Sequence, residues 1–299
     1  MILQLNNLSF SYHGKDAETK AVEKMSFSVN EGDFVGIVGP SGCGKTTILN
    51  LLAGIAKPGE GEILLRGKPL NENTPKNRKF FGGPEENASK NRKFFGGPKL
   101  KDAKKQQACE ESGKIALMPQ RDQLFEWRTI EKNVCLGLEI AHRSNKETKE
   151  YGRELLVKYG LKDFMKKHPS ELSGGMRQRA ALIRTLVTEP DILLLDEPFS
   201  ALDFQTRLNV CDDVYAIIKQ EKKTALLVSH DISESISLCD KVVVLSSRPS
   251  HVVAEIDIDL DKSLTPLKRR ECADFSKYFE IIWKLLEGTN DGRTQTIFS

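Results

Sequence analysis

The stretch Gly39-Pro-Ser-Gly-Cys-Gly-Lys-Thr-Thr47 decides the fold of this chain. It follows the pattern G-x-x-x-x-G-K-[ST], with an apolar run, 33–39, leading into it and a helix-forming run, 45–53, leading out of it. Glycines in such a loop allow the backbone conformations that turn successive N–H groups toward phosphate oxygens, and the start of the helix adds the positive end of its dipole. The pattern therefore predicts a phosphate-binding loop between a strand and a helix.

The loop supplies candidate residues for binding ATP and Mg²⁺. Lys45 is expected to reach the β- and γ-phosphates, and the Thr46 hydroxyl is expected to ligate Mg²⁺. Cys43 should react with a bulky thiol reagent and be protected by ATP, unless it is simply a small residue that fits the turn. An accidental glycine-rich turn is the alternative for the whole loop, and the strand–loop–helix context argues against it. The candidate nucleotide-binding positions are Gly39, Pro40, Ser41, Gly42, Cys43, Gly44, Lys45, Thr46 and Thr47.

A second apolar run predicts the other half of this site. Ile192-Leu-Leu-Leu-Asp-Glu197 reads as a buried strand with two acidic residues at its carboxyl end, where α/β proteins bind their ligands. Asp196 is expected to hold Mg²⁺, usually through water, and Glu197 to polarise the attacking water. The alternative is an ordinary buried strand that ends in a solvated acid pair. The phosphate-binding loop upstream argues against this alternative.

Composition excludes several other classes of protein. The chain has 299 residues, of which 39% are apolar and 29% charged, as in ordinary globular proteins. No apolar run approaches the ~18–20 residues needed to cross a bilayer, and the N-terminus has no secretory-signal pattern. The six cysteines form no C-x-x-C pair, which favours reduced thiols over a disulfide framework or a zinc site. Outside 71–114 the chain is close to neutral, so charge gives no support to nucleic-acid binding.

Hydrophobic patterning predicts an α/β fold. Alternating apolar residues over 8–12 and 25–29 predict an antiparallel sheet, whereas near-continuous apolar runs predict parallel strands that are covered on both faces. Residues 121–188 are expected to be mostly helical, with a last helix over about 267–287. Further strands are expected at 33–39, 59–65, 114–118, 191–195, 225–229 and 242–246. The expected fold class is thus a P-loop NTPase core with an antiparallel β subdomain and a helical insert subdomain.

The segment 71–114 interrupts this pattern. It contains a tandem repeat, 77–90 followed by 91–104, and carries eleven Lys and Arg against six Asp and Glu. Paired Gly-Gly-Pro and dense charge oppose regular structure, which predicts an exposed, largely disordered insertion. A surface insertion that arose by duplication is the first interpretation, and a basic arm that touches anionic lipid or a partner is the second.

Leu172-Ser-Gly-Gly-Met-Arg-Gln178 points to a family. Ser173 is a good N-cap, and Gly174 and Gly175 bare the start of the following helix, which makes it an anion site. Here the sequence resembles ABC ATPases, which use LSGGQ-like signatures, although Met176 stands in the fifth position. The resemblance implies that this helix end faces the γ-phosphate held by a partner subunit, so that ATP is hydrolysed only in a paired site. Alone, Ser-Gly-Gly would read as a capped surface helix.

The remaining landmarks of that family follow in the expected order. By resemblance, Gln120 is the Q-loop glutamine that senses Mg²⁺, and Asp203 ends the D-loop that crosses the dimer interface. His230 matches the switch histidine that contacts the γ-phosphate, and Tyr12 the aromatic that stacks on adenine, with Phe10 as its competitor. The implied catalytic set is Glu197, His230, Gln120 and Lys45, and the implied metal ligands are Thr46, Gln120 and Asp196.

Finer likeness points to importer ATPases of the nitrate/sulfonate/taurine group, on the stretches 124–129 (LFEWRT), 173–179 (SGGMRQR) and 198–203 (PFSALD). The likeness implies a head-to-tail dimer of ATPase subunits at the cytoplasmic face of the cell membrane. Its partners would be integral membrane permease subunits and, indirectly, an extracytoplasmic solute-binding protein, with no nucleic acid. One ABC ATPase domain is expected over 1–299: core and β subdomain in 1–70, 114–120 and 189–260, the insertion in 71–113, the helical signature subdomain in 121–188, and a C-terminal helix and tail in 261–299.

Two other functions share these motifs. A soluble ABC ATPase that acts on nucleic acid or protein assemblies is one alternative, but repair members carry long coiled coils between the ATP motifs, and no sustained heptads are present here. Translation-associated members usually hold two ATPase units per chain, and one is present here. An exporter-type ATPase is the other alternative, and the Met176-Arg177 pair in the signature argues against it.

Overall fold

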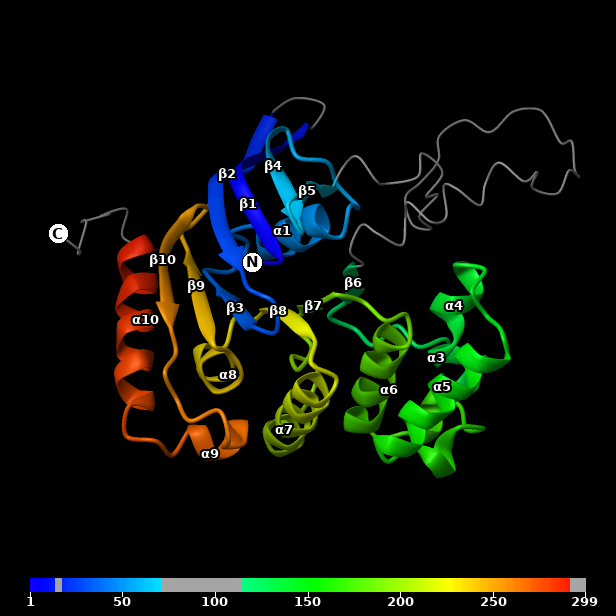
Figure 1. Cartoon of the computed structure of the whole chain (residues 1–299). Helices are drawn as coiled ribbons and strands as arrows, with labels where there is room; N and C mark the ends of the chain where they lie inside the picture. Colours follow the sequence, from blue (N-terminus) through cyan, green and yellow to red (C-terminus); the bar gives the residue numbers. More distant parts are fainter. Residues whose placement is uncertain (14–17, 71–114, 291–299) are drawn as a thin grey trace, which may run out of the picture.

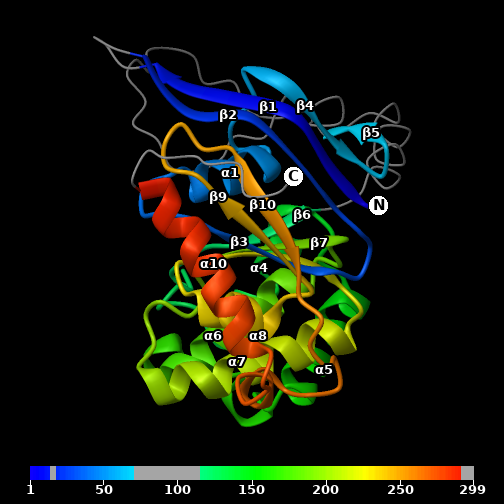
Figure 2. The same ribbon diagram turned by 90° about the vertical axis from the view of Figure 1, so that its left-hand side faces the viewer.

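The computed structural model describes residues 1–13, 18–70 and 115–290, and it has the α/β architecture that the sequence predicts (Figure 1). The predicted disordered insertion at 71–114 lies outside the described residues. Two sheets organise the rest. A four-stranded antiparallel sheet stands above a six-stranded sheet, and α1 lies between the two (Figures 1 and 2).

The small sheet has the strand order β2-β1-β4-β5. Its apolar side chains alternate with polar ones, as on β1, where Leu3 and Leu5 are buried and Gln4 and Asn6 are only half-buried. The predicted antiparallel pairing of the first two strands is confirmed, with Leu5 opposite Phe27. The strands are β1 (Leu3–His13), β2 (Glu18–Val29), β4 (Glu60–Leu65) and β5 (Lys68–Pro69).

The large sheet has the strand order β10-β9-β3-β8-β7-β6 and is parallel except for β10. Its central strands are apolar almost throughout because both faces are covered, with helix α1 (Lys45–Leu52) on one side and α7 (Phe204–Gln220) and α8 (Ile232–Leu238) on the other. The carboxyl ends of the parallel strands therefore meet at one edge. The strands are β3 (Phe34–Val38), β6 (Ile115–Met118), β7 (Ile192–Asp196), β8 (Thr224–Val228), β9 (Lys241–Leu245) and β10 (Val252–Asp257).

The predicted helical region is confirmed between β6 and β7, and it forms a group of helices at the β6 end of the large sheet (Figure 1). Local sequence explains where its helices begin: Thr129, Asn145 and Ser173 each cap a helix with their side chains. The elements are α3 (Ile130–Val134), α4 (Leu136–Ile140), α5 (Lys146–Lys158), the short 3₁₀ turns Lys162–Phe164 and Pro169–Glu171, and α6 (Gly174–Leu186).

The C-terminal part corrects the sequence prediction in two ways. The single helix predicted over 267–287 is wrong, because the chain forms a short α9 (Pro266–Arg269) and, after a break, a separate α10 (Phe275–Asn290). The sequence analysis also missed β10, whose residues are only half-buried. Helix α10 lies along the β10 edge of the large sheet beside α8 (Ile232–Leu238), and its Ile282 is fully buried there (Figure 2).

Two apolar clusters sit on opposite faces of the large sheet. One joins α1 and the small sheet, and the other joins the helical region with α7 (Phe204–Gln220), α8 and α10. Strand β7 shows the division, since Leu193 and Leu195 belong to one cluster and Ile192 and Leu194 to the other. Within the described ranges, no helix is both long enough and apolar enough to cross a membrane.

Candidate functional site

The loop 39–44 joins β3 to α1 at the carboxyl edge of the large sheet, as predicted. Gly44 has a φ of 122°, and a Cβ at this position would lie 3.2 Å from the carbonyl oxygen of Ala21. Glycine is therefore required at this turn. The Lys45 ammonium is buried and donates to the carbonyl oxygens of Gly39 (2.8 Å) and Pro40 (3.0 Å), which curls its side chain back over the loop.

A hollow of about 490 Å³ opens above this loop. It is lined by Ser41, Gly42, Gly44, Lys45, Thr46, Thr47, Glu197, His230 and Arg248. These residues come from α1 and its loop and from the ends of three different strands, so that only the fold brings them together. The structure thus unites the predicted phosphate loop with the predicted acid of β7 and the predicted histidine after β8.

Polar side chains at the β7 end form one connected group. The Glu197 carboxylate lies 3.2 Å from His230 Nδ1 and accepts a hydrogen bond of 3.2 Å from Gln120 Nε2. The Gln120 amide also donates to the Ser200 hydroxyl. Thr46 Oγ1 lies 3.5 Å from an Asp196 carboxylate oxygen. The five residues that the sequence assigned to catalysis and Mg²⁺ at this end of the site are therefore neighbours.

The electrostatics at Asp196 favour a cation. Burial raises the pKa of its carboxyl, and the neighbouring Glu197 charge raises it further, against the smaller lowering effects of Thr46 and Lys45. A hydroxyl, a carboxylate and an amide oxygen (Thr46, Asp196 and Gln120) are hard oxygen ligands of the kind that Mg²⁺ takes, together with water and phosphate oxygens. The donor set in this structure therefore fits Mg²⁺.

Tyr12 of β1 lies beside the first turn of α1. Its hydroxyl is 2.9 Å from the Thr47 hydroxyl, and its ring is 45% exposed. Phe10 packs edge-on against that ring, with 4.9 Å between centroids, and belongs to the apolar cluster under the small sheet. Of the two aromatic candidates, Tyr12 is thus the one that borders the phosphate loop with an open ring.

The signature residues do not line this hollow in the described part of the chain. Ser173 caps α6 by accepting from the Met176 N–H, and Ser173 and Gly174 are exposed. A Cβ on Gly175 would lie 2.8 Å from Val210 of α7, so the glycine lets these helices pack closely. Asp203 caps α7 through Thr206 and is exposed too. Both helix starts present free surface away from their own chain's phosphate loop.

Cys43 corrects a sequence prediction. The thiol is 1% exposed and belongs to the apolar cluster under α1, and burial raises its pKa. A buried, protonated thiol is a poor nucleophile. The expectation of a readily modified cysteine is therefore wrong for the folded chain, and the small residue that fits the turn is the correct interpretation.

Sequence analysis missed Arg248. It lies in the loop between β9 and β10 and lines the hollow opposite the acidic group. The stretch Ser246-Ser-Arg-Pro-Ser250 reads as an ordinary turn, and only the position of β9 beside β3 brings it to the phosphate loop. A basic residue in the loop that follows a strand of the parallel sheet was the available signal.

Comparison with known proteins agrees with this geometry. The sequence model of the family described as "ABC transporter" matches residues 22–200. The uncharacterized ABC transporter ATP-binding protein YtlC of Bacillus subtilis is 39% identical over 95% of each chain. The aliphatic sulfonates import ATP-binding protein SsuB of Bacillus thuringiensis is 32% identical over 87% of each. The ATP-binding cassette MJ0796, in a dimeric post-hydrolysis state bound to ADP and Pi, superposes with a TM-score of 0.64 at 26% identity, over 86% of this chain and 99% of its own.

The fold and the site define a P-loop ATPase. The matches are more specific, and the chain belongs to the ABC transporter family. It is an ATP hydrolase and the ATP-binding subunit of a transporter, and cassettes of this family dimerise.

Proposed function

We propose that this chain powers a membrane importer for small organic solutes, of the kind that carries nitrate, sulfonates or taurine. The observation that carries the proposal is an exposed aromatic pair on the loop that follows Gln120. Trp127 is 76% exposed and stacks on Phe125, with 4.7 Å between ring centroids. Sulfonate importers among the relatives support the same assignment.

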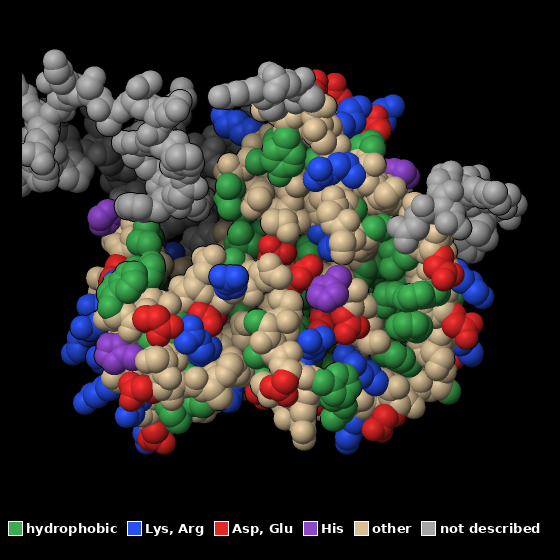
Figure 3. Space-filling view, turned by 180° about the vertical axis from the view of Figure 1, so that it is seen from behind, with side chains coloured by type: hydrophobic (Ala, Val, Ile, Leu, Met, Phe, Trp, Pro, Cys, Tyr) green, Lys and Arg blue, Asp and Glu red, His purple; other side chains and the backbone are tan. Residues whose placement is uncertain are grey.

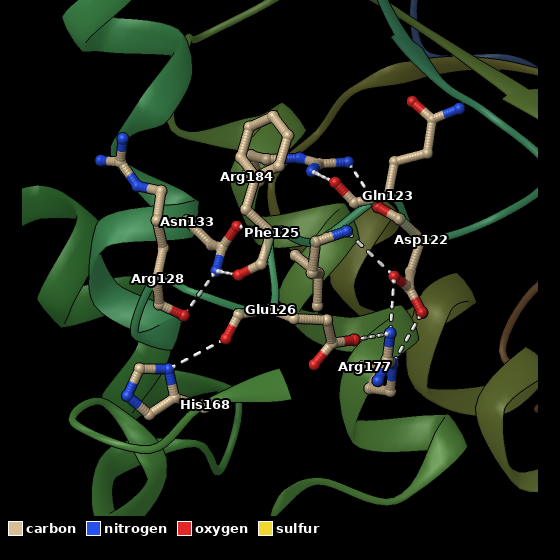
Figure 4. Close-up of polar contacts among 10 residues, drawn as sticks. Asp122, Gln123, Phe125, Glu126, Arg128, Asn133, His168, Arg177 and Arg184 are labelled. Carbon is tan, nitrogen blue, oxygen red and sulfur yellow. Dashed lines mark hydrogen bonds and ion pairs between the residues drawn. The ribbon is translucent and has the colours of Figure 1, made fainter. Parts of the chain in front are cut away.

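The aromatic pair stands on a rigid base. Asn133 of α3 is fully buried, its amide donates to the carbonyl oxygens of Phe125, Arg128 and Thr129, and its oxygen accepts from the Phe125 N–H (Figure 4). One side chain thus fixes the loop from both ends. Large aromatic side chains on a fixed loop are typical anchors of protein interfaces. We assign this loop as the place where the permease docks.

The same loop is tied to the signature helix. Arg177 of α6 donates to Asp122 (2.8 Å) and to Glu126 (2.8 Å), and Arg184 donates to the backbone oxygens of Asp122 and Gln123 (Figure 4). These contacts link the loop to the first and the last turn of α6. A change at Gln120 would therefore move the docking loop and the signature together, and residues 121–188 are proposed as the unit that moves.

The proposed reaction uses the connected polar group at the β7 end. Lys45 and the loop N–H groups bind the phosphates, and Glu197 orients the attacking water. His230, held beside Glu197, contacts the γ-phosphate. Mg²⁺, when bound by Thr46, Asp196 and Gln120, would neutralise developing charge on the phosphate oxygens. To bind the phosphates, the Lys45 ammonium must leave the carbonyl oxygens of Gly39 and Pro40. The negative charge of the arriving phosphates favours this exchange.

A second subunit is proposed to complete each site. Ser173 and Gly174 are exposed at the start of a 13-residue helix, with Gly175 packed behind them against Val210, and none of the three lines the hollow of its own chain. This helix start is the proposed anion-binding end. A head-to-tail partner would place this end over the γ-phosphate and Asp203 across the interface. The resulting assembly would sit at the cytoplasmic face of the membrane, with integral membrane permease subunits and, indirectly, an extracytoplasmic solute-binding protein.

Recovery from membranes tests the docking assignment. The tagged full chain is expressed in its own cells, membranes are solubilised in mild detergent, and the recovered proteins are identified. Wild type should recover a multi-span permease, and Trp127→Ala should lose it while still binding ATP. Trp283→Ala on α10, an exposed tryptophan outside the loop, is the matched control and should keep the permease. Equal recovery by Trp127→Ala, or recovery of ribosomes or DNA in place of a permease, would overturn the proposal.

A further inference from the structure

The loop between β9 and β10 is anchored on β2. The Ser250 N–H and hydroxyl both donate to the carbonyl oxygen of Ala21, at 3.0 and 3.2 Å, and the Ser250 carbonyl accepts from the Glu23 N–H. Ser246 holds the other end, since its hydroxyl contacts the Ser247 and Pro249 carbonyls. Arg248, at the exposed tip of the loop, thus extends from a fixed base.

This base lies beside the middle of the phosphate loop. A Cβ on Gly44 would meet the Ser250 hydroxyl at 3.3 Å, and one on Gly39 would meet the Leu245 side chain at 3.0 Å. In the strand order β9-β3-β8-β7, the loop after β9 lies on one side of the phosphate loop, and Glu197 and His230, which follow β7 and β8, lie on the other. Arg248 therefore lines the hollow on the side of the phosphate loop away from the proposed γ-phosphate end.

Arg248 has no partner in the described part of the chain. No hydrogen bond or ion pair joins its guanidinium to another described residue, although most other arginines of the helical region and the sheet edges have carboxylate or carbonyl partners. Its charge is felt inside the loop, where it opposes the larger effect of burial on the pKa of Cys43. Seen from behind, charged side chains of both signs are interspersed among several separate hydrophobic groups on the surface (Figure 3). An unpaired guanidinium facing a phosphate site is suited to bidentate contact with phosphate oxygens.

We infer that Arg248 is a nucleotide-binding residue that contacts the α- and β-phosphates of ATP. The contact supplements the loop N–H groups and Lys45 from the opposite wall of the hollow. Because ADP carries the same two phosphates, Arg248 should hold the product as firmly as the substrate. The residue would therefore set nucleotide affinity and the rate of ADP release, while the chemistry at Glu197 proceeds without it.

Titration of the full chain with nucleotide tests this assignment. Arg248→Ala is compared with wild type for Mg²⁺–ADP and for a Mg²⁺–ATP analogue with a non-hydrolysable β–γ bond, by calorimetry. A charge-assisted hydrogen bond at an exposed position should be worth about a tenfold rise in Kd. The rise should be equal for both nucleotides, and Arg248→Lys, which keeps the charge without the fork, should lie between.

The controls separate binding from folding. Arg143→Ala, an exposed arginine on the helical region, should leave both Kd values unchanged. The melting temperature of Arg248→Ala without nucleotide should match that of wild type, because the side chain holds nothing in the described chain. Unchanged affinity for both nucleotides would remove Arg248 from the site. A loss confined to the ATP analogue would place the guanidinium at the γ-phosphate and would contradict the inference as well.

Discussion

Glu197→Gln separates ATP binding from ATP hydrolysis. The substitution keeps the shape of the side chain and its length, so the neighbours His230 (3.2 Å) and Gln120 (3.2 Å) retain a side chain to contact. It removes the negative charge that would orient and polarise the attacking water. Binding should persist, because the phosphates are held by Lys45 and the loop N–H groups rather than by Glu197.

The size of the effect follows from the role. A positioned general base typically raises the reaction rate by about 10²- to 10⁴-fold, which corresponds to about 2.7–5.4 kcal/mol of activation free energy. We therefore expect kcat to fall by at least about a hundredfold, with the Kd for ATP within about twofold of wild type. The assay is steady-state phosphate release paired with equilibrium nucleotide binding on the same preparations.

A matched control tests whether the loss is specific. Glu280→Gln on α10 removes the same charge from an exposed carboxylate whose nearest partner, Lys284, is 4.0 Å away. Its turnover should equal that of wild type. If Glu197→Gln keeps turnover within tenfold of wild type while binding ATP, the water-orienting role belongs to another residue, with His230 the next to test.

Three further predictions concern the fold and the loop. Ile282→Ala should lower the free energy of unfolding by about 2–5 kcal/mol because it empties a fully buried site, whereas its exposed neighbour Ile281→Ala should cost under about 0.5 kcal/mol in the same urea titration. Burial alone would raise the pKa of Asp240, but the Phe34 N–H, Lys262 and Lys219 outweigh it and lower the pKa below the ordinary 3.8. The ionised carboxylate therefore stabilises the fold at neutral pH, and this stabilisation is lost as pH falls through the folded-state pKa. Asp240→Asn should be less stable than wild type by about 1.5–3 kcal/mol at pH 7, and the difference should shrink below about pH 4. A difference that is independent of pH would contradict this. Cys43 should stay unlabelled by maleimide in the native chain with or without ATP and react only on unfolding, as followed by peptide mass; rapid native labelling would contradict its buried position.

Much of the nucleotide site could be predicted because its residues occupy fixed places relative to strands. Lys45 follows a glycine turn, Asp196 ends an apolar run, and parallel strands bring their carboxyl ends to one edge. The order of such motifs along the chain was sufficient to assign His230 and Glu197 to the same nucleotide site. Their roles remain proposals that the experiments above address.

Other features lacked a sequence signal. Strand β10 lies at a sheet edge, and its half-buried residues show no clear alternation, so it was missed. The break between α9 and α10 contains neither Gly nor Pro, and it arises where Arg269 turns inward to donate to the Tyr215 hydroxyl and the Ser237 carbonyl. Arg248 approaches the phosphate loop only because β9 pairs with β3 across 200 residues of sequence. These are tertiary effects that no local pattern carries.

The central claim is that each ATP is bound by one subunit and hydrolysed in a site that a second subunit completes. The most direct measurement is the ATPase turnover per subunit across a range of protein concentration, with the fraction of dimer followed in parallel by sedimentation in saturating Mg²⁺–ATP. The account predicts that nucleotide binding stays constant while turnover per subunit rises in proportion to the dimer fraction. Turnover that is the same for the monomer and the dimer would show that one chain holds a complete site, and would contradict the account.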